Sequence, residues 1–167
     1  MKDPIRHVVV DTNILGDFLY PNGTKAVKRV ERSKILLSAV LNARWPAIKL
    51  YTPAICIAEA MGILDKYRFC SWGNDIKKDS SLKLSAADYR SARKVLTDAV
   101  GQRTIEQLEH EPTHVLMAGL ISPVNSYFQI RRNKRKKLPM GAADCVIAGM
   151  AIHLVSRMRR ESALLVT

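Results

Sequence analysis

The sequence predicts a three-layer α/β/α protein, in which a central parallel sheet lies between two layers of helices. Short apolar runs of strand length alternate with longer stretches of helical periodicity along the chain. The first run, residues 7–10, contains three consecutive valines, which is typical of a strand buried on both faces. The 167 residues, 47% of them apolar, are enough for one core. We therefore expect a single domain over residues 1–167.

Four short apolar segments are predicted to be strands. They are residues 7–10, 48–51, 113–120 and 163–166. Because helical segments connect them, we expect the strands to pair in parallel. The carboxyl ends of strands in such a sheet form the crevice where ligands bind.

The helix predictions use apolar spacing together with capping residues at the helix starts. Thr24 and Thr52 are candidate caps, and Pro53 fits the first turn of a helix. Ser85, followed three residues later by Asp88, resembles a capping box. The predicted helices are residues 14–20, 24–42, 52–68, 85–110 and 142–158, with another beginning at Ser122 and a loop over residues 71–81.

The charge of the chain indicates a polyanionic partner. Lysine and arginine outnumber aspartate and glutamate by 27 to 15, which gives a net charge of +12. Such a field attracts nucleic acid, although a well-solvated basic surface has the same composition. Aromatic residues make up only 6%, so the sequence does not predict a platform for stacking bases.

Two other classes of protein are disfavoured by the sequence. The N-terminus lacks the long apolar segment of a secretory signal, and no apolar stretch reaches the roughly 18 residues of a membrane span. We therefore expect a soluble, cytoplasmic protein. The cysteines are odd in number and widely spaced, which favours buried free thiols over disulfides or a zinc motif. They are Cys56, Cys70 and Cys145.

Three acidic residues are the strongest functional candidates. Asp11 directly follows the three valines, at the carboxyl end of the first predicted strand. Glu59 is the only charged residue between Lys49 and Asp65, and Asp144 falls in the first turn of a helix rich in small residues. Each has a structural alternative: Asp11 as a helix cap, Glu59 as a solvent-facing residue, and Asp144 as a partner of the helix dipole.

Together, the three acids predict a metal site. Close carboxylates repel one another, and hard cations such as Mg²⁺ or Mn²⁺ prefer oxygen ligands. A metal bound there can activate water for attack on a phosphate, so no protein nucleophile is required. The four histidines are scattered along the sequence, with no pairing that indicates a Ser–His or Cys–His device.

Several segments resemble motifs of the PIN-domain nucleases, and more closely the VapC-type toxin ribonucleases. The segment Val-Val-Val-Asp11-Thr12-Asn13 is similar to the first family motif, and the segment from Thr52 to Glu59 is similar to the second. Ala143-Asp144 and the apolar and small residues that follow are similar to the third motif. Residues 163–167 resemble the strand before the fourth motif, so the resemblance spans nearly the whole chain.

The resemblance implies a PIN-like fold and a metal-dependent endoribonuclease. The implied metal ligands for Mg²⁺ or Mn²⁺ are Asp11, Glu59 and Asp144, with Thr12 and Asn13 lining the catalytic site. The implied substrate is RNA, and the implied partners are a cognate antitoxin and a second copy in a homodimer.

One departure from the family leads to an alternative function. The family places another acid two residues after the threonine that corresponds to Thr167, where this sequence ends. We therefore expect the chain to lack the C-terminal end of the family fold. The alternative is a catalytically impaired PIN-like module for RNA binding or assembly. A haloacid dehalogenase-type phosphatase is disfavoured, because its second aspartate would stand where this chain has Asn13.

A basic run precedes the Asp144 helix and is a candidate RNA-binding segment. Its six cations could contact phosphates beside the cleft, which adds affinity without sequence specificity. A solvated helix end and a nuclear localisation signal have similar composition. The cations are Arg131, Arg132, Lys134, Arg135, Lys136 and Lys137.

Overall fold

The protein has a four-stranded parallel sheet with the strand order β3-β2-β1-β4. The computed structural model describes residues 6–20, 27–69, 83–121, 141–157 and 162–166. The strands are β1 (Arg6–Val10), β2 (Ile48–Pro53), β3 (Ile105–Leu108) and β4 (Ser162–Val166).

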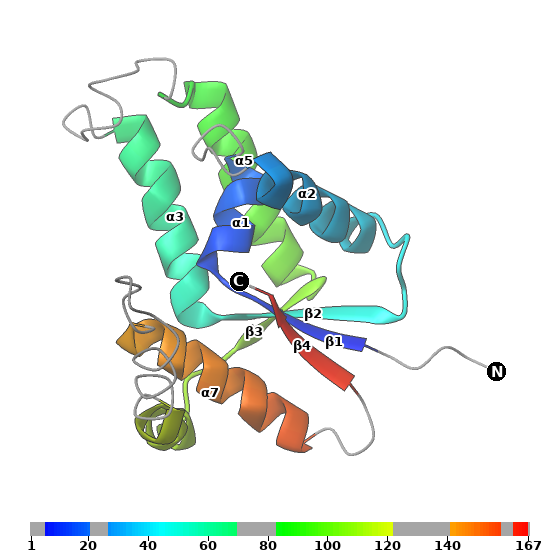
Figure 1. The fold of residues 1–167 in the computed structure, drawn as a ribbon. Helices are drawn as coiled ribbons and strands as arrows, with labels where there is room; N and C mark the ends of the chain where they lie inside the picture. Colours follow the sequence, from blue (N-terminus) through cyan, green and yellow to red (C-terminus); the bar gives the residue numbers. More distant parts are fainter. Residues whose placement is uncertain (1–5, 21–26, 70–82, 122–140, 158–161, 167) are drawn as a thin grey trace.

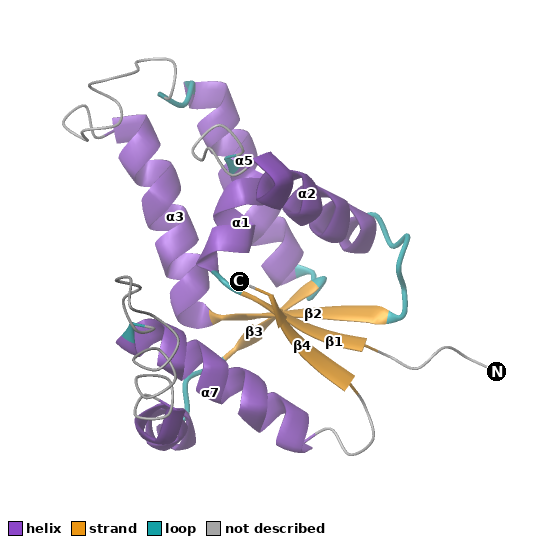
Figure 2. Ribbon diagram, viewed as in Figure 1, coloured by secondary structure: helices purple, strands orange, loops and turns teal. Residues whose placement is uncertain are grey.

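Helices cover both faces of this sheet, as the sequence predicts. Four helices lie on one face, while α7 and a helix over residues 112–121 lie on the other (Figures 1 and 2). The helices with full bounds are α1 (Thr12–Leu19), α2 (Val27–Leu41), α3 (Ala54–Phe69), α5 (Ala86–Gly101) and α7 (Ala142–Arg157). The predicted α/β class with helices on both sides of a parallel sheet is confirmed.

Strand β1 is buried on both faces because its valines alternate between two apolar cores. Val8 and Val10 pack into the core beneath α1 and α5, whereas Val9 packs with Tyr51 and Ala151 on the α7 side. This arrangement explains the continuous apolar run, since a strand covered on both sides has no polar face.

The strand order creates a switch point beside β1. The chain runs outward from β1 through β2 to β3, and then returns to place β4 on the opposite side of β1. Right-handed crossovers put the connections of these two directions on opposite faces of the sheet. The carboxyl ends of β1 and β4 therefore flank the crevice where ligands bind in open α/β sheets.

The strand prediction at residues 113–120 is wrong, because these residues belong to a helix. Pro112 stands at the first helical position, where its missing N–H and fixed φ are favourable. The third strand is instead β3, which the sequence analysis placed within a helix over residues 85–110. That helix ends at Gly101, and the chain turns through Arg103 at φ 56° before β3.

The other described helices and strands agree with the predicted ranges to within a few residues. The candidate cap Thr24, the loop predicted over residues 71–81 and the helix predicted to begin at Ser122 lie outside the described residues. Ser85 caps α5 by accepting the backbone N–H of Asp88 at 3.0 Å, as predicted. Pro53 is the last residue of β2, so α3 begins at Ala54 and not at the predicted Thr52. Among the described cysteines, Cys56 and Cys145 are buried free thiols. No helix in the described ranges has the length and hydropathy needed to cross a membrane.

A close contact between α7 and the 112–121 helix depends on Gly149. A Cβ at this position would lie 3.0 Å from the His114 carbonyl oxygen and 3.1 Å from the Met117 Cβ. We expect Gly149→Ala to lower the free energy of unfolding by about 1–3 kcal/mol, because two backbones must separate. Urea unfolding measures this change.

The matched control is Gly62→Ala on α3, where an added Cβ meets nothing within 4 Å. This substitution should stabilise the protein by about 0.5–1 kcal/mol, through helix propensity alone. Equal effects at the two glycines would contradict the close packing of α7.

Candidate active site

Asp11 lies directly after β1, at the switch point, and is only 5% exposed. Its Oδ1 accepts the backbone N–H of Ile14 at 3.1 Å, so it is the N-cap of α1. Its Oδ2 accepts the side-chain amide of Asn13 at 3.2 Å. The capping alternative is therefore correct for Asp11. A carboxylate has about four acceptor positions, so these two bonds leave it able to bind a cation.

Burial raises the pKa of Asp11 above its ordinary value. The hydrogen bonds from Ile14 and Asn13 lower that pKa, and the negative charge of Asp144 raises it. The net increase means that the site holds a carboxylate whose charge is poorly compensated by the protein. A bound cation would favour the ionised form of such a group.

Thr12 connects the first acid to the second. Its hydroxyl donates a short hydrogen bond to the Glu59 carboxylate, which joins the start of α1 to the second turn of α3. Glu59 is exposed, so the solvent-facing alternative describes its position. Because α3 begins where β2 ends, Glu59 also lies toward the carboxyl edge of the sheet.

Asp144 lies in the first turn of α7 and is exposed. Its Oδ2 accepts the backbone N–H of Gly141 at 3.1 Å, so the carboxylate binds the backbone that immediately precedes α7. Its charge nevertheless acts on Asp11. Asp144 therefore stabilises the start of α7, as the structural alternative states, and it also interacts electrostatically with Asp11.

The three acids approach one another without forming a tight cluster. Among the described residues, only one group of three metal-ligating side chains has its ligand atoms within 4.8 Å of one another, and Glu111, His114 and His153 form it. Mg²⁺ retains several waters when it binds to proteins, so carboxylates at wider spacing can hold it through those waters.

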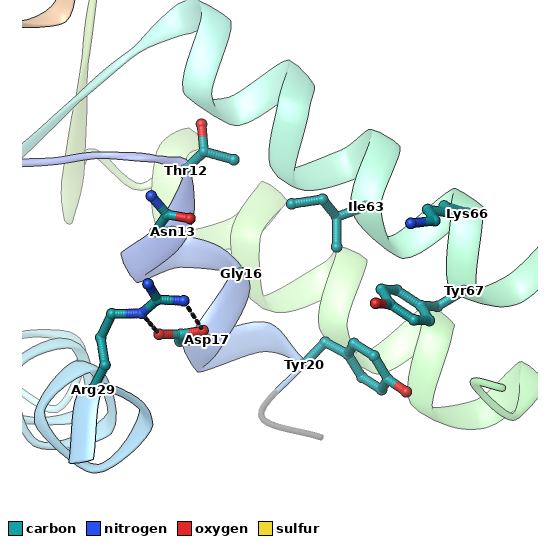
Figure 3. A pocket seen from close by; sticks show the side chains of 9 residues that line it. All are labelled: Thr12, Asn13, Gly16, Asp17, Tyr20, Arg29, Ile63, Lys66 and Tyr67. Atoms are coloured by element: carbon teal, nitrogen blue, oxygen red, sulfur yellow. Dashed lines mark hydrogen bonds and ion pairs between the residues drawn. The ribbon is translucent and has the colours of Figure 1, made fainter. Parts of the chain in front are cut away.

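A cleft of about 220 Å³ with a mixed polar and apolar lining lies between α1, α2 and α3 (Figure 3). Thr12 and Asn13 line it at the end nearest β1, and Lys66 lines it from α3. Tyr20 and Tyr67 lie together in the same cleft, with ring centroids 4.6 Å apart. The cleft therefore extends from Thr12 and Asn13, which neighbour Asp11 in the sequence, past a lysine to two aromatic rings.

The same cleft contains an ion pair that the sequence did not reveal. Arg29 of α2 donates two hydrogen bonds to Asp17 of α1, one of them from Nη2 at 3.2 Å. The hydrogen bond to Asp17 is the main cause of the raised pKa of Arg29. The Asp17 side chain is 5% exposed and that of Arg29 is 38% exposed, so one partner is buried and the other reaches solvent.

Three of the four histidines also come together, contrary to their scattered positions in the sequence. His110, His114 and His153 make consecutive ring contacts, with centroids 5.9 Å and 4.9 Å apart. One sequence signal pointed to part of this cluster. Glu111 and His114 stand three residues apart, so their side chains lie on the same face only if the segment forms a helical turn. Because residues 113–120 were predicted to be a strand, this helical spacing was not considered.

The predicted cations at positions 131–137 lie outside the described residues.

Comparison of the chain with protein-family models, with curated proteins and with solved structures gives no match.

Proposed function

We propose that the protein is a PIN-like endoribonuclease that depends on Mg²⁺ or Mn²⁺ and uses Asp11, Glu59 and Asp144. One observation carries this proposal: Asp11 is buried at the switch point of the sheet, where the charge of Asp144 acts on it. An acid with a perturbed pKa in a ligand-binding crevice is a functional candidate. The likeness of three sequence motifs to those of PIN-domain nucleases adds support.

The donor chemistry of these residues fits a hard divalent cation. All three acids offer carboxylate oxygens, which suit Mg²⁺ and Mn²⁺. Asp11 is desolvated and carries an imperfectly balanced charge, which a cation would neutralise. When bound, the metal would activate water and stabilise negative charge on the phosphate.

The neighbouring side chains hold these acids in place. Asn13 orients the Asp11 carboxylate through Oδ2, and Thr12 orients Glu59. Cys56 lies close by, but burial raises its pKa, so the thiol stays protonated and is a poor nucleophile. Water is therefore the attacking group in this proposal.

RNA is the proposed substrate because the chain has a net charge of +12 and the cleft carries Lys66. The run at positions 131–137 would add further phosphate contacts. The resemblance to toxin ribonucleases suggests three further proposals: a cognate antitoxin that holds the enzyme inactive, a homodimer, and a cytoplasmic location.

The second candidate is an RNA-binding or assembly module of the same fold without catalysis. The capping bonds of Asp11 and Asp144 favour it, because a purely structural role explains both residues. The wide spacing of the acids is also consistent with this alternative.

A cleavage assay with labelled structured RNA separates the two candidates. The wild-type protein should cleave with Mg²⁺ or Mn²⁺ and lose activity in EDTA. Glu59→Gln and Asp144→Asn should each reduce the rate by about 10–100-fold or more, the cost of disturbing even the outer shell of a metal site.

The matched control is Glu106→Gln, since Glu106 is an exposed acid on β3, away from the switch point. It should cleave at the wild-type rate. Salt-sensitive RNA binding without metal-dependent cleavage would support the second candidate, and the absence of RNA binding would contradict both.

A further inference from the structure

A second polar pocket lies on the α7 side of the sheet, apart from the three acids. It has a volume of about 200 Å³ and is lined by the end of β3 and the residues that follow it, by the 112–121 helix and by the second half of α7. His153 follows Asp144 by nine residues on α7, or roughly 13 Å along a helix. This pocket is therefore distinct from the candidate active site.

Three side chains of this pocket face one another closely. His114 Nε2 lies 2.8 Å from His153 Nδ1, and His153 Nδ1 lies 3.7 Å from a carboxylate oxygen of Glu111. One ligand atom from each residue lies within 4.8 Å of the other two. His114 is buried, and His153 and Glu111 are partly exposed, so an ion can reach the group from solvent.

We propose that Glu111, His114 and His153 bind one divalent transition-metal ion, with Zn²⁺ the best-suited ion. Two imidazoles and one carboxylate form a known zinc ligand set, which leaves a further position for water. Imidazole nitrogen favours Zn²⁺ and its neighbours in the transition series, whereas Mg²⁺ favours oxygen alone. The site would thus select a different metal from the one proposed for the acids near Asp11.

Neutral imidazole is the form that binds metals, and the burial of His114 lowers its pKa toward that form. Glu111 also faces Arg157, at 3.6 Å, but the Arg157 side chain is 68% exposed and can turn to solvent when an ion takes its place.

Metal binding must rearrange one hydrogen bond. His114 Nδ1 accepts the backbone N–H of Glu111 at 2.9 Å, so the neutral ring carries its proton on Nε2 and donates it to His153. When Nε2 binds the ion, that proton passes to Nδ1 and the Glu111 amide turns away. Residues 109–111 precede the helix and are not in regular structure, which allows this movement.

The test is a Zn²⁺ titration of the full chain by calorimetry, with excess Mg²⁺ present to compete for sites that offer oxygen ligands alone. The wild-type protein should bind one Zn²⁺ at this site, and the amide signal of Glu111 should shift in NMR spectra. His153→Gln and Glu111→Gln should each weaken Zn²⁺ binding by more than about tenfold, since even outer-shell changes cost about 10–100-fold.

The matched controls are His110→Gln and Glu109→Gln, which alter an adjacent histidine and an acid lining the same pocket. Both should bind Zn²⁺ as the wild type does. If Glu111→Gln and His153→Gln also retain wild-type affinity, or if the wild type binds no Zn²⁺ beside Mg²⁺, the proposal is wrong. Glu111 is partly exposed, so its variant should fold even if a histidine variant does not. RNA cleavage is not used in this test, so its outcome is independent of the proposed nuclease function.

Discussion

Asp11→Asn should abolish metal-dependent RNA cleavage while making the metal-free protein more resistant to heat. The loss of activity should be about 100-fold or more, because a ligand contributes more than the outer-shell groups that are worth about 10–100-fold. The gain in stability follows from the burial of Asp11, which raises its pKa and makes its charge costly. An asparagine oxygen can still accept the N–H of Ile14, so the cap of α1 is kept, and the Asn13 amide can turn its oxygen toward the new NH2 group.

Thermal unfolding in EDTA measures the second effect. We expect the melting temperature to rise by a few degrees, since about 1 kcal/mol corresponds to about 2–4 °C in a domain of this size. Added Mg²⁺ should raise the melting temperature of the wild type and not that of the variant, because ligand binding stabilises only the protein that binds it.

Asp98→Asn is the matched control for this substitution. Asp98 pairs with Lys94 at 2.7 Å on α5, and both side chains are well exposed. The control should leave cleavage unchanged and alter stability by less than about 0.5 kcal/mol. If Asp11→Asn cleaves RNA as fast as the wild type, Asp11 is a helix cap and no more.

The strand end that carries Asp11 could be predicted because its signal is local. Three valines before Asp11 indicate a strand buried on both faces, and the structure puts β1 between two apolar cores. The capping pattern at Ser85 is equally local and is confirmed. The distances between the acids could not be predicted in the same way. They depend on how α3 and α7 pack against the sheet, and this packing is set by contacts between segments that are far apart in the sequence.

Strand β3 and the 112–121 helix were predicted poorly because their local propensities conflict with their structure. Strand β3 has the sequence Ile-Glu-Gln-Leu, in which only Ile105 favours a strand, and it becomes one by pairing with β2. Residues 113–120 contain β-branched and apolar residues but follow Pro112, which starts a helix. In β3, pairing with a neighbouring strand therefore outweighed the local preference of the residues. In residues 113–120, the preceding proline favoured a helix over the predicted strand.

The Asp17–Arg29 pair was also beyond the reach of the sequence, because it joins two helices. The partners are 12 residues apart and meet only when α1 and α2 pack together. Because Asp17 is buried and Arg29 is partly exposed, we expect mutation of the two partners to change the free energy of unfolding by different amounts. Removing the exposed partner leaves a buried carboxylate uncompensated, whereas removing the buried charge leaves an arginine that can reach water.

Arg29→Met should therefore be among the most destabilising substitutions in this protein. We expect a loss of about 3 kcal/mol in the free energy of unfolding, at the lower end of the range for breaking a buried pair, because Arg29 is partly exposed. Asp17→Asn should cost less, about 1–2 kcal/mol, since its amide oxygen can still accept from Arg29. Urea denaturation of both variants and of the double variant measures these terms.

The double variant distinguishes an electrostatic cause from a loss of packing. If the uncompensated charge of Asp17 is the cause, Arg29→Met combined with Asp17→Asn should be more stable than Arg29→Met alone, because the buried charge is then gone. Lys94→Met, which breaks the exposed pair with Asp98, should cost no more than about 0.5 kcal/mol. Equal losses for Arg29→Met and Lys94→Met would contradict the role of burial. A double variant no more stable than Arg29→Met would instead indicate that Arg29 acts through the packing of its alkyl chain between α1 and α2.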